Sequence, residues 1–450
     1  MLVTIVLLFL ILGSLFFIIR YGFCGIAATF LLCGSITDSA GILYALDSIF
    51  PYYKLLIWIF TYLLMGIALI LLANNKEDIL FYKWYFWPFF ISSILINVTG
   101  ILNSSVDGFA RASSSFVMSG IPYFFIWRAG RSKPGRETLL FNILLVHAVV
   151  AIIIILGKNT LAPLNGLTYI SRIDQDYAIY EFERYIETSI SFFTFSKYEV
   201  QKTAQFHNSN GLGFFAVILI VIGFSFLKGS IISKRIVNKN VKGVLFLLLG
   251  LIFWFNSLTR GPIIAVLFVY IYIQFKTRGF LIVAPFLIVF LLILFVEPAF
   301  FNFVYYLIPE SNNVSITSRF AGYTEGLQAI YRNPLTGVDP ASILYLPHFY
   351  PLKVMALHGV IAGLLVSIPI IHCMILSVRN FKADSKIGFK GRSAINLMLL
   401  ACLLGIYVTN GVVSQVLFGI LFAEICYNNN VAKLERNIKK SEYRFSNINK

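Results

Sequence analysis

The sequence predicts an all-α, polytopic membrane helix bundle of about 12–14 transmembrane helices, with two larger external loops that are partly helical. The chain has 450 residues, of which 58% are hydrophobic and only 12% are charged. Its mean hydropathy is +0.83. Apolar runs of roughly 20 residues, enough to cross a bilayer, recur along the chain, and basic residues gather between them. A soluble domain of this length would not carry so many long apolar runs.

Thirteen membrane spans are expected, and they follow the apolar runs in chain order. Their approximate positions are 2–19, 22–38, 54–73, 84–102, 112–128, 138–157, 211–227, 243–258, 262–275, 279–296, 352–376, 394–410 and 412–427. The side of the membrane on which the N-terminus lies stays open. Thirteen spans would place it outside, whereas twelve or fourteen would place it inside.

Five basic clusters fix the orientation of the later spans. Cytoplasmic loops carry an excess of Lys and Arg, and all five clusters alternate correctly if they face the cytoplasm. The loops 158–210 and 297–351 are then external. The clusters lie near residues 128–136, 228–242, 276–278, 379–392 and 433–450.

The same pattern divides the chain into six regions. They are N-terminal transmembrane helices (1–157), a first external loop (158–210), further transmembrane helices (211–296), a second external loop with the catalytic candidates (297–351), C-terminal transmembrane helices (352–427) and a basic cytoplasmic tail (428–450).

The formal net charge of +16 does not indicate a nucleic-acid partner. The basic residues belong to the predicted cytoplasmic loops, so membrane lipids or a substrate carrying phosphate are the expected negative partners. No phosphate-cradling loop or nucleotide fingerprint is present, and no cofactor is expected. The external pair Asp174 and Asp176 has no second ligand cluster near it, so no metal site is expected. The five cysteines show no metal-ligand spacing.

The segment Thr317–Gly363 is the one long stretch that mixes polar and loop-forming residues between two apolar spans. Arg319 is predicted to open a helix over 319–332, where its guanidinium suits a phosphate because its donors match two oxygens at once. The alternatives are pairing with Glu325 or with a lipid headgroup. Polar inserts of this kind are where membrane proteins concentrate chemistry or transport.

Two histidines in this segment receive different interpretations. His348 lies between two prolines just ahead of a span, and a neutral imidazole there could take a proton from a hydroxyl; a purely structural role is the alternative. His358 lies inside the apolar run and is expected to be a buried, hydrogen-bonded histidine.

Arg260 lies at an external membrane edge beside Gly261 and Pro262, which mark a helix break. A broken helix next to a charged residue is how membrane proteins build binding sites. An arginine that reaches the lipid headgroups is the alternative.

Four motifs resemble the O-antigen polymerase/ligase (Wzy/WaaL-like) family, and they occur in that family's order. The sequence TSRFAGYTEGLQAIYRNPLTGVD resembles the family's arginine-led helix and its N/H-P-L-x-G-V-G turn. PHFYPLKVMALHGVIAG is similar to the H-N-x-x-L…G-x-x-G element, LTRG at 258–261 to S-R-G, and FHNSNGLG at 206–213 to F-x-x-P-N-x-L-A/G. The matches cover the C-terminal half of the chain.

The motifs depart from the family pattern at several positions. Asp339 replaces a glycine, Phe349 an asparagine, Ser209 a proline and Thr259 a serine. The family's ligases carry an arginine shortly before the F-x-x-P-N element, where this chain has Gln201 and Lys202. Lysine supplies a point charge instead of a fork of donors. This departure favours a polymerase over a ligase.

The resemblance implies an inverting, metal-independent glycosyltransferase that uses an undecaprenyl-pyrophosphate-linked oligosaccharide in lipopolysaccharide biosynthesis. His348 would be the catalytic base. The pyrophosphate would be bound by Arg260, Arg319 and Lys202, and the substrate by His207, Asn210 and Tyr323. The activated donor supplies the energy, and a chain-length regulator protein is a further expected partner.

Two alternatives stay open from the sequence. One is an O-antigen ligase, which transfers the glycan to lipid A core. The other is a transporter of polysaccharide or small anions, which would carry buried charges in mid-span. This chain has few such charges, and its notable ones lie at the outer ends of spans.

Overall fold

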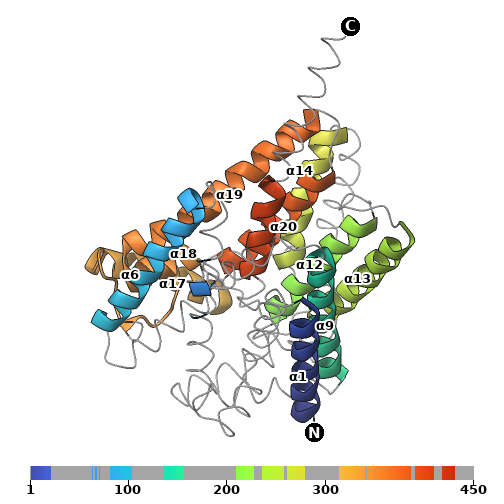
Figure 1. Ribbon diagram of the computed structural model, residues 1–450. Helices are drawn as coiled ribbons and strands as arrows, with labels where there is room; N and C mark the ends of the chain where they lie inside the picture. Colours follow the sequence, from blue (N-terminus) through green and yellow to red (C-terminus); the bar gives the residue numbers. More distant parts are fainter. Residues whose placement is uncertain are drawn as a thin grey trace.

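The structure is a computed structural model, and all of its regular structure in the described residues is helical (Figure 1). The all-α prediction is confirmed for this part of the chain. The described residues are 2–21, 63, 66–67, 70, 82–103, 136–156, 209–227, 236–257, 261–278, 314–339, 342–347, 349–386, 391–409 and 418–430.

The helices follow the predicted spans closely wherever both are described. They are α1 (Leu2–Tyr21), the π-helical turn η2 (Tyr82–Phe86), α6 (Trp87–Asn103), α9 (Arg136–Leu156), α12 (Ser209–Leu227), α13 (Ile236–Ser257), α14 (Gly261–Arg278), α17 (Val314–Arg332), α18 (Tyr350–His358), α19 (Val360–Lys386) and α20 (Gly391–Thr409). Residues 418–430 are also helical.

Two of the described helices are long and apolar enough to cross a membrane, Trp84–Asn103 and Val360–Asp384. Shorter apolar helices lie within α1, α9, α12, α13, α14 and α20. The predicted spans 22–38, 112–128 and 279–296 fall outside the described residues, and so does nearly all of the loop 158–210. Within the second predicted loop, α17 agrees with the expectation that this loop is partly helical.

Two predicted boundaries were wrong. The span expected over 352–376 is divided, because α18 ends at His358 and α19 starts at Val360. Gly359 between them has φ 90°, a left-handed conformation that side chains with a Cβ rarely adopt. The helix predicted over 319–332 begins earlier, at Val314, so Arg319 lies in its second turn instead of opening it.

The helices pack into two neighbouring groups joined by α19 and α20. In Figure 1, α6, α17 and α18 gather around the first part of α19, while α12 and α14 lie beside α20 and α13 packs on α12. Small residues allow close approach in the second group, since a Cβ on Gly223 of α12 would lie 2.9 Å from the carbonyl oxygen of Gly243 of α13. The first group holds most of the segment Thr317–Gly363.

The break at Gly359 yields a prediction about stability. A Cβ at this position would overlap the carbonyl of Leu335, and the backbone conformation is unfavourable for alanine. We expect Gly359→Ala to destabilise the folded protein by roughly 1–3 kcal/mol. Thermal unfolding of the detergent-solubilised protein measures the effect. Gly66→Ala is the matched control, because a Cβ there meets no atom within 4 Å. Equal unfolding temperatures for the two variants would contradict the prediction.

Candidate functional site

The segment immediately before His348 is fixed against α17. The backbone N–H of Tyr345 donates a hydrogen bond of 2.9 Å to Oε2 of Glu325. Two glycines of α17 leave room for this segment, since a Cβ on Gly322 would lie 3.0 Å from the Leu346 carbonyl oxygen and a Cβ on Gly326 would overlap the ring of Pro347. The Glu325 carboxylate therefore helps to hold the segment 345–347, directly before position 348, against α17.

The turn after α17 is bound to the break between α18 and α19. The N–H of Val338 donates to the carbonyl oxygen of Ala356 at 2.9 Å, and the N–H of Val360 donates to that of Pro334 at 2.8 Å. Gly337 has φ 71°, and a Cβ there would overlap the backbone of Leu357. The family-like turn N-P-L-T-G-V thus packs backbone to backbone on the start of the following span.

Helix α6 supplies a row of polar side chains to the same structure. Nδ2 of Asn103 donates to the carbonyl oxygens of Thr336 at 2.7 Å and Leu357 at 3.4 Å. Nearer the middle of α6, Oγ of Ser92 donates to the carbonyl oxygen of Ala362 at 3.1 Å. These bonds join the N-terminal half of the chain to the turn and to the first residues of α19.

His358 is buried and hydrogen-bonded, as the sequence predicted. It is 5% exposed, and its Nδ1 lies 3.0 Å from Oγ1 of Thr99. The Thr99 hydroxyl donates its one proton to the carbonyl oxygen of Leu95 at 2.7 Å, so Nδ1 of His358 must be the donor to Oγ1. The ring proton of His358 therefore lies on Nδ1.

The two remaining described histidines have structural partners. Nδ1 of His147 lies 2.9 Å from the carbonyl oxygen of Ile143, one turn earlier in α9. His372 in α19 lies 3.2 Å from the hydroxyl of Tyr85, and its ring stacks on Trp84. Both histidines lie within apolar helices, and these contacts give them structural roles.

Most of the sequence-predicted site residues lie outside the described part of the chain. These are His348, Arg260, Lys202 and His207. Arg319 and Asn210 are described by their backbone alone, in α17 and in the first turn of α12. Tyr323 is half-buried in α17.

The described helices bring together the neighbourhoods of several of these residues. A Cβ on Gly405 in α20 would lie 2.7 Å from the ring of Phe214 and 3.9 Å from Cβ of Ala265. The second turns of α12 and α14, which come soon after Asn210 and Arg260 in the chain, therefore meet on α20. Helix α20 also contacts α18. This arrangement favours a convergence of the predicted motifs at one end of the bundle.

The sequence interpretation missed the contribution of α6. Ser92, Thr99 and Asn103 are spaced at i, i+7 and i+11, which places them on one face of a helix. Polar side chains aligned on one face of an apolar span face a protein partner. That spacing was the available signal.

A family model described as O-antigen ligase matches residues 245–354. The match contains α14, α17, the glycine turn and the beginning of α18, together with Arg260, Arg319, Tyr323 and His348. This match supports the assignment of the chain to the O-antigen polymerase and ligase superfamily. The resemblance found in the motifs is thereby confirmed.

The same match supports a coarse function for the chain. It is an integral membrane protein with a function of the O-antigen polymerase or ligase type, which is a glycosyltransferase-like activity on a lipid-linked oligosaccharide. The matched region ends at Val354 and excludes Lys202, His207 and Asn210. None of the curated proteins compared with the chain matches it. Among the described residues, no group of three or more His, Cys, Asp or Glu could hold a metal ion.

Proposed function

We propose that this superfamily member is an O-antigen polymerase that joins undecaprenyl-pyrophosphate-linked repeat units at the periplasmic face of the inner membrane. The transfer is inverting and independent of metal. The observation that carries the proposal is the fixed segment 345–347, which Glu325, Gly322 and Gly326 hold against α17 directly before His348. A general base needs a defined position relative to its substrate, and an anchored segment supplies one.

The proposed reaction has one displacement step. His348 takes the proton of the acceptor hydroxyl, and the hydroxyl oxygen attacks the anomeric carbon of the donor sugar. The bond from that carbon to the pyrophosphate oxygen breaks, and the electron pair leaves with undecaprenyl pyrophosphate. Arg260, with Arg319 or Lys202, stabilises the negative charge on the leaving group. The proton on His348 is then released to solvent.

The remaining assignments complete the substrate site. His207, Asn210 and Tyr323 contact the glycan, and apolar surfaces between helices hold the polyprenyl tail. The hydrogen bonds of Asn103 to Thr336 and Leu357 support this arrangement, because they tie the end of a membrane span to the turn that precedes His348. A chain-length regulator protein would act on this periplasmic face.

The ligase reaction is the second candidate, because the matching family model is described as O-antigen ligase. The two reactions share donor and mechanism and differ in the acceptor. A polymerase uses another lipid-linked repeat unit, whereas a ligase uses lipid A core.

Reconstitution separates these two functions. The purified protein in liposomes receives its lipid-linked repeat unit, with or without lipid A core. A polymerase produces a ladder of undecaprenyl-linked chains without lipid A core. A ligase produces glycan only on lipid A core. The absence of any new glycosidic bond under both conditions would overturn the proposal.

A further inference from the structure

Lys353 lies in the first turn of α18, five residues after His348. Its side chain is half-buried, and its backbone N–H donates a hydrogen bond of 3.0 Å to the carbonyl oxygen of Phe349. Helix α18 leads from the segment 345–347 towards the apolar helix Val360–Asp384, which is long enough to cross a membrane. The fold therefore carries an ammonium group from the neighbourhood of the proposed base towards an apolar environment.

The contacts of its neighbours show which side of α18 Lys353 occupies. A Cβ on Gly363 of α19 would overlap the side chain of Met355, so Met355 marks the side of α18 that faces α19. With 3.6 residues per turn, Lys353 lies on roughly the opposite side of the helix. Leu357, one turn after Lys353, clusters with Ala329 of α17. Lys353 is therefore on the α17 side of α18.

Helix α17 turns one face towards this region. Arg319, Gly322 and Gly326 are spaced at i, i+3 and i+7, which places the three positions on that face. A Cβ on Gly326 would lie 3.5 Å from Cγ of Leu352 in the first turn of α18, whereas Gly322 packs on the segment 345–347. The position of Arg319 is therefore nearer to the segment before the proposed base, and the first turn of α18 lies further towards the span.

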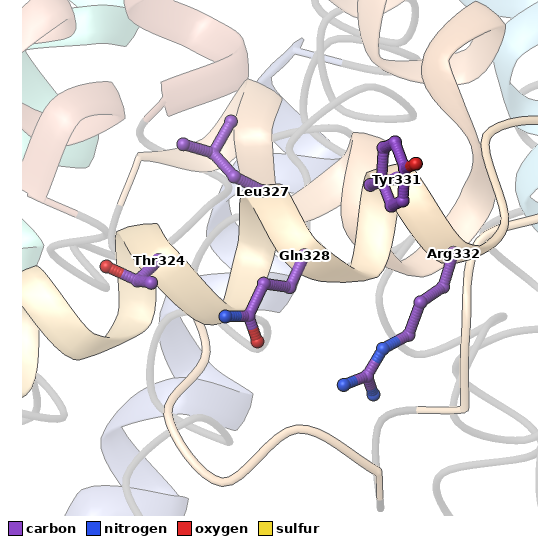
Figure 2. A pocket seen from close by; sticks show the side chains of 5 residues that line it. All are labelled: Thr324, Leu327, Gln328, Tyr331 and Arg332. Atoms are coloured by element: carbon purple, nitrogen blue, oxygen red, sulfur yellow. The ribbon is translucent and has the colours of Figure 1, made fainter.

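The second arginine of α17 belongs to another face of the helix. Arg332 lies beside Gln328, and both residues line a hollow of about 350 Å³ together with Tyr331 (Figure 2). Its charge is therefore not directed at the face that carries Gly322 and Gly326.

Lys353 lacks an anion to balance its charge. Within the described part of the chain, its ammonium forms no ion pair or hydrogen bond. The one carboxylate of α17, that of Glu325, accepts the hydrogen bond from the N–H of Tyr345. An ammonium partly removed from water is costly without an anion, and charged side chains in membrane segments mark the paths of substrates. The position therefore suits a negatively charged ligand.

We propose that Lys353 binds the phosphate next to the polyprenyl chain in the pyrophosphate of the lipid-linked substrate. The inference rests on the proposed function and adds a specificity-determining residue to its donor site. The phosphate next to the sugar lies by the reacting carbon, and therefore near His348. The polyprenyl chain must enter the apolar region, so the second phosphate lies further towards the span, as Lys353 does. Lys353 thereby selects carriers with two phosphates over carriers with one.

The test measures binding without any transfer. Purified protein in phosphatidylcholine nanodiscs is titrated with undecaprenyl pyrophosphate and with undecaprenyl phosphate. We expect Lys353→Gln to bind the pyrophosphate roughly 10–100-fold more weakly than the parent and the monophosphate equally well. Lys353→Arg keeps the charge and should keep most of the preference for the pyrophosphate.

Lys242→Gln is the matched control. Lys242 is also a half-buried lysine of an apolar helix, but its Nζ lies 4.6 Å from the centre of the Phe141 ring. This variant should bind both carriers as the parent does. An equal loss of pyrophosphate binding in Lys242→Gln and Lys353→Gln would show a general effect of lost positive charge and would overturn the assignment.

The unfolding temperature of the ligand-free protein tests a purely structural role. Removal of a charge that has no partner should leave this temperature unchanged or raise it in Lys353→Gln. A variant that does not fold, or that unfolds at a lower temperature and keeps the parental preference, would show a structural lysine and overturn the inference. A lower unfolding temperature only in nanodiscs with phosphatidylglycerol, again with the parental preference, would assign Lys353 to a bilayer headgroup and also overturn it.

The binding result and the proposed function fail separately. An unchanged preference in Lys353→Gln, or a parent that does not prefer the pyrophosphate, overturns the role of Lys353 and leaves the transfer reaction to the reconstitution assay. A preference that is lost in Lys353→Gln sustains this role even if the parent forms no glycosidic bond in that assay.

Discussion

Replacement of His348 by alanine is expected to slow glycan transfer by roughly 10²–10⁴-fold, the usual contribution of a general base. The acceptor hydroxyl is a poor nucleophile while it keeps its proton, and His348 is the proposed group that removes it. The flanking segment is held by the bond from the Tyr345 N–H to Glu325 and by the contact of Pro347 with Gly326. The variant should therefore fold normally and still bind donor. Single-turnover transfer in liposomes measures the rate.

A second histidine provides the control. His358→Gln removes a buried imidazole that is bonded to Thr99, so this variant should lose stability while retaining transfer per folded molecule. Unfolding temperature and transfer rate together distinguish the two residues. Cells that still make long polysaccharide chains with His348→Ala would rule out the catalytic role of this residue.

Hydropathy predicted the helices because each span is long, apolar and bounded by charges. It did not predict the break at Gly359, since the apolar run continues on both sides of His358 and Gly359. The break depends on the backbone conformation of Gly359 and on its close contact with Leu335. Such a contact forms between segments and leaves no mark in the periodicity of either one.

The polar contacts of α6 could not be predicted from the sequence for the same reason. Thr99 and His358 lie 259 positions apart, and nothing local in either helix specifies the other as a partner. The burial of His358 was predictable from its apolar neighbours, but the identity of its partner was not. The candidate site has a different origin. Its members were assigned by motif resemblance, and the structure adds the framework around them through Glu325, Gly337 and Asn103.

Arg260→Ala is expected to reduce transfer by roughly 10²–10³-fold, because the departing pyrophosphate would lose a charged donor. Arg260 directly precedes α14, whose second turn meets α12 and α20 around Gly405. Arg260→Lys keeps the positive charge but loses the fork of donors that matches two phosphate oxygens, so its rate should lie between those of the parent and Arg260→Ala. The measurement is the transfer rate of all three proteins at saturating donor.

The lysine variant also separates the proposed role from an arginine that only reaches the lipid headgroups. A lysine anchors a helix end at the headgroups as well as an arginine does, so a headgroup anchor predicts the parental rate for Arg260→Lys. Arg379→Ala is the matched control, because Arg379 is an exposed arginine near the C-terminal end of α19. Its loss should leave the transfer rate unchanged. If Arg260→Ala transfers glycan at the parental rate, Arg260 does not stabilise the leaving pyrophosphate. The same substitutions at Arg319 and Lys202 would then identify which of these two residues does.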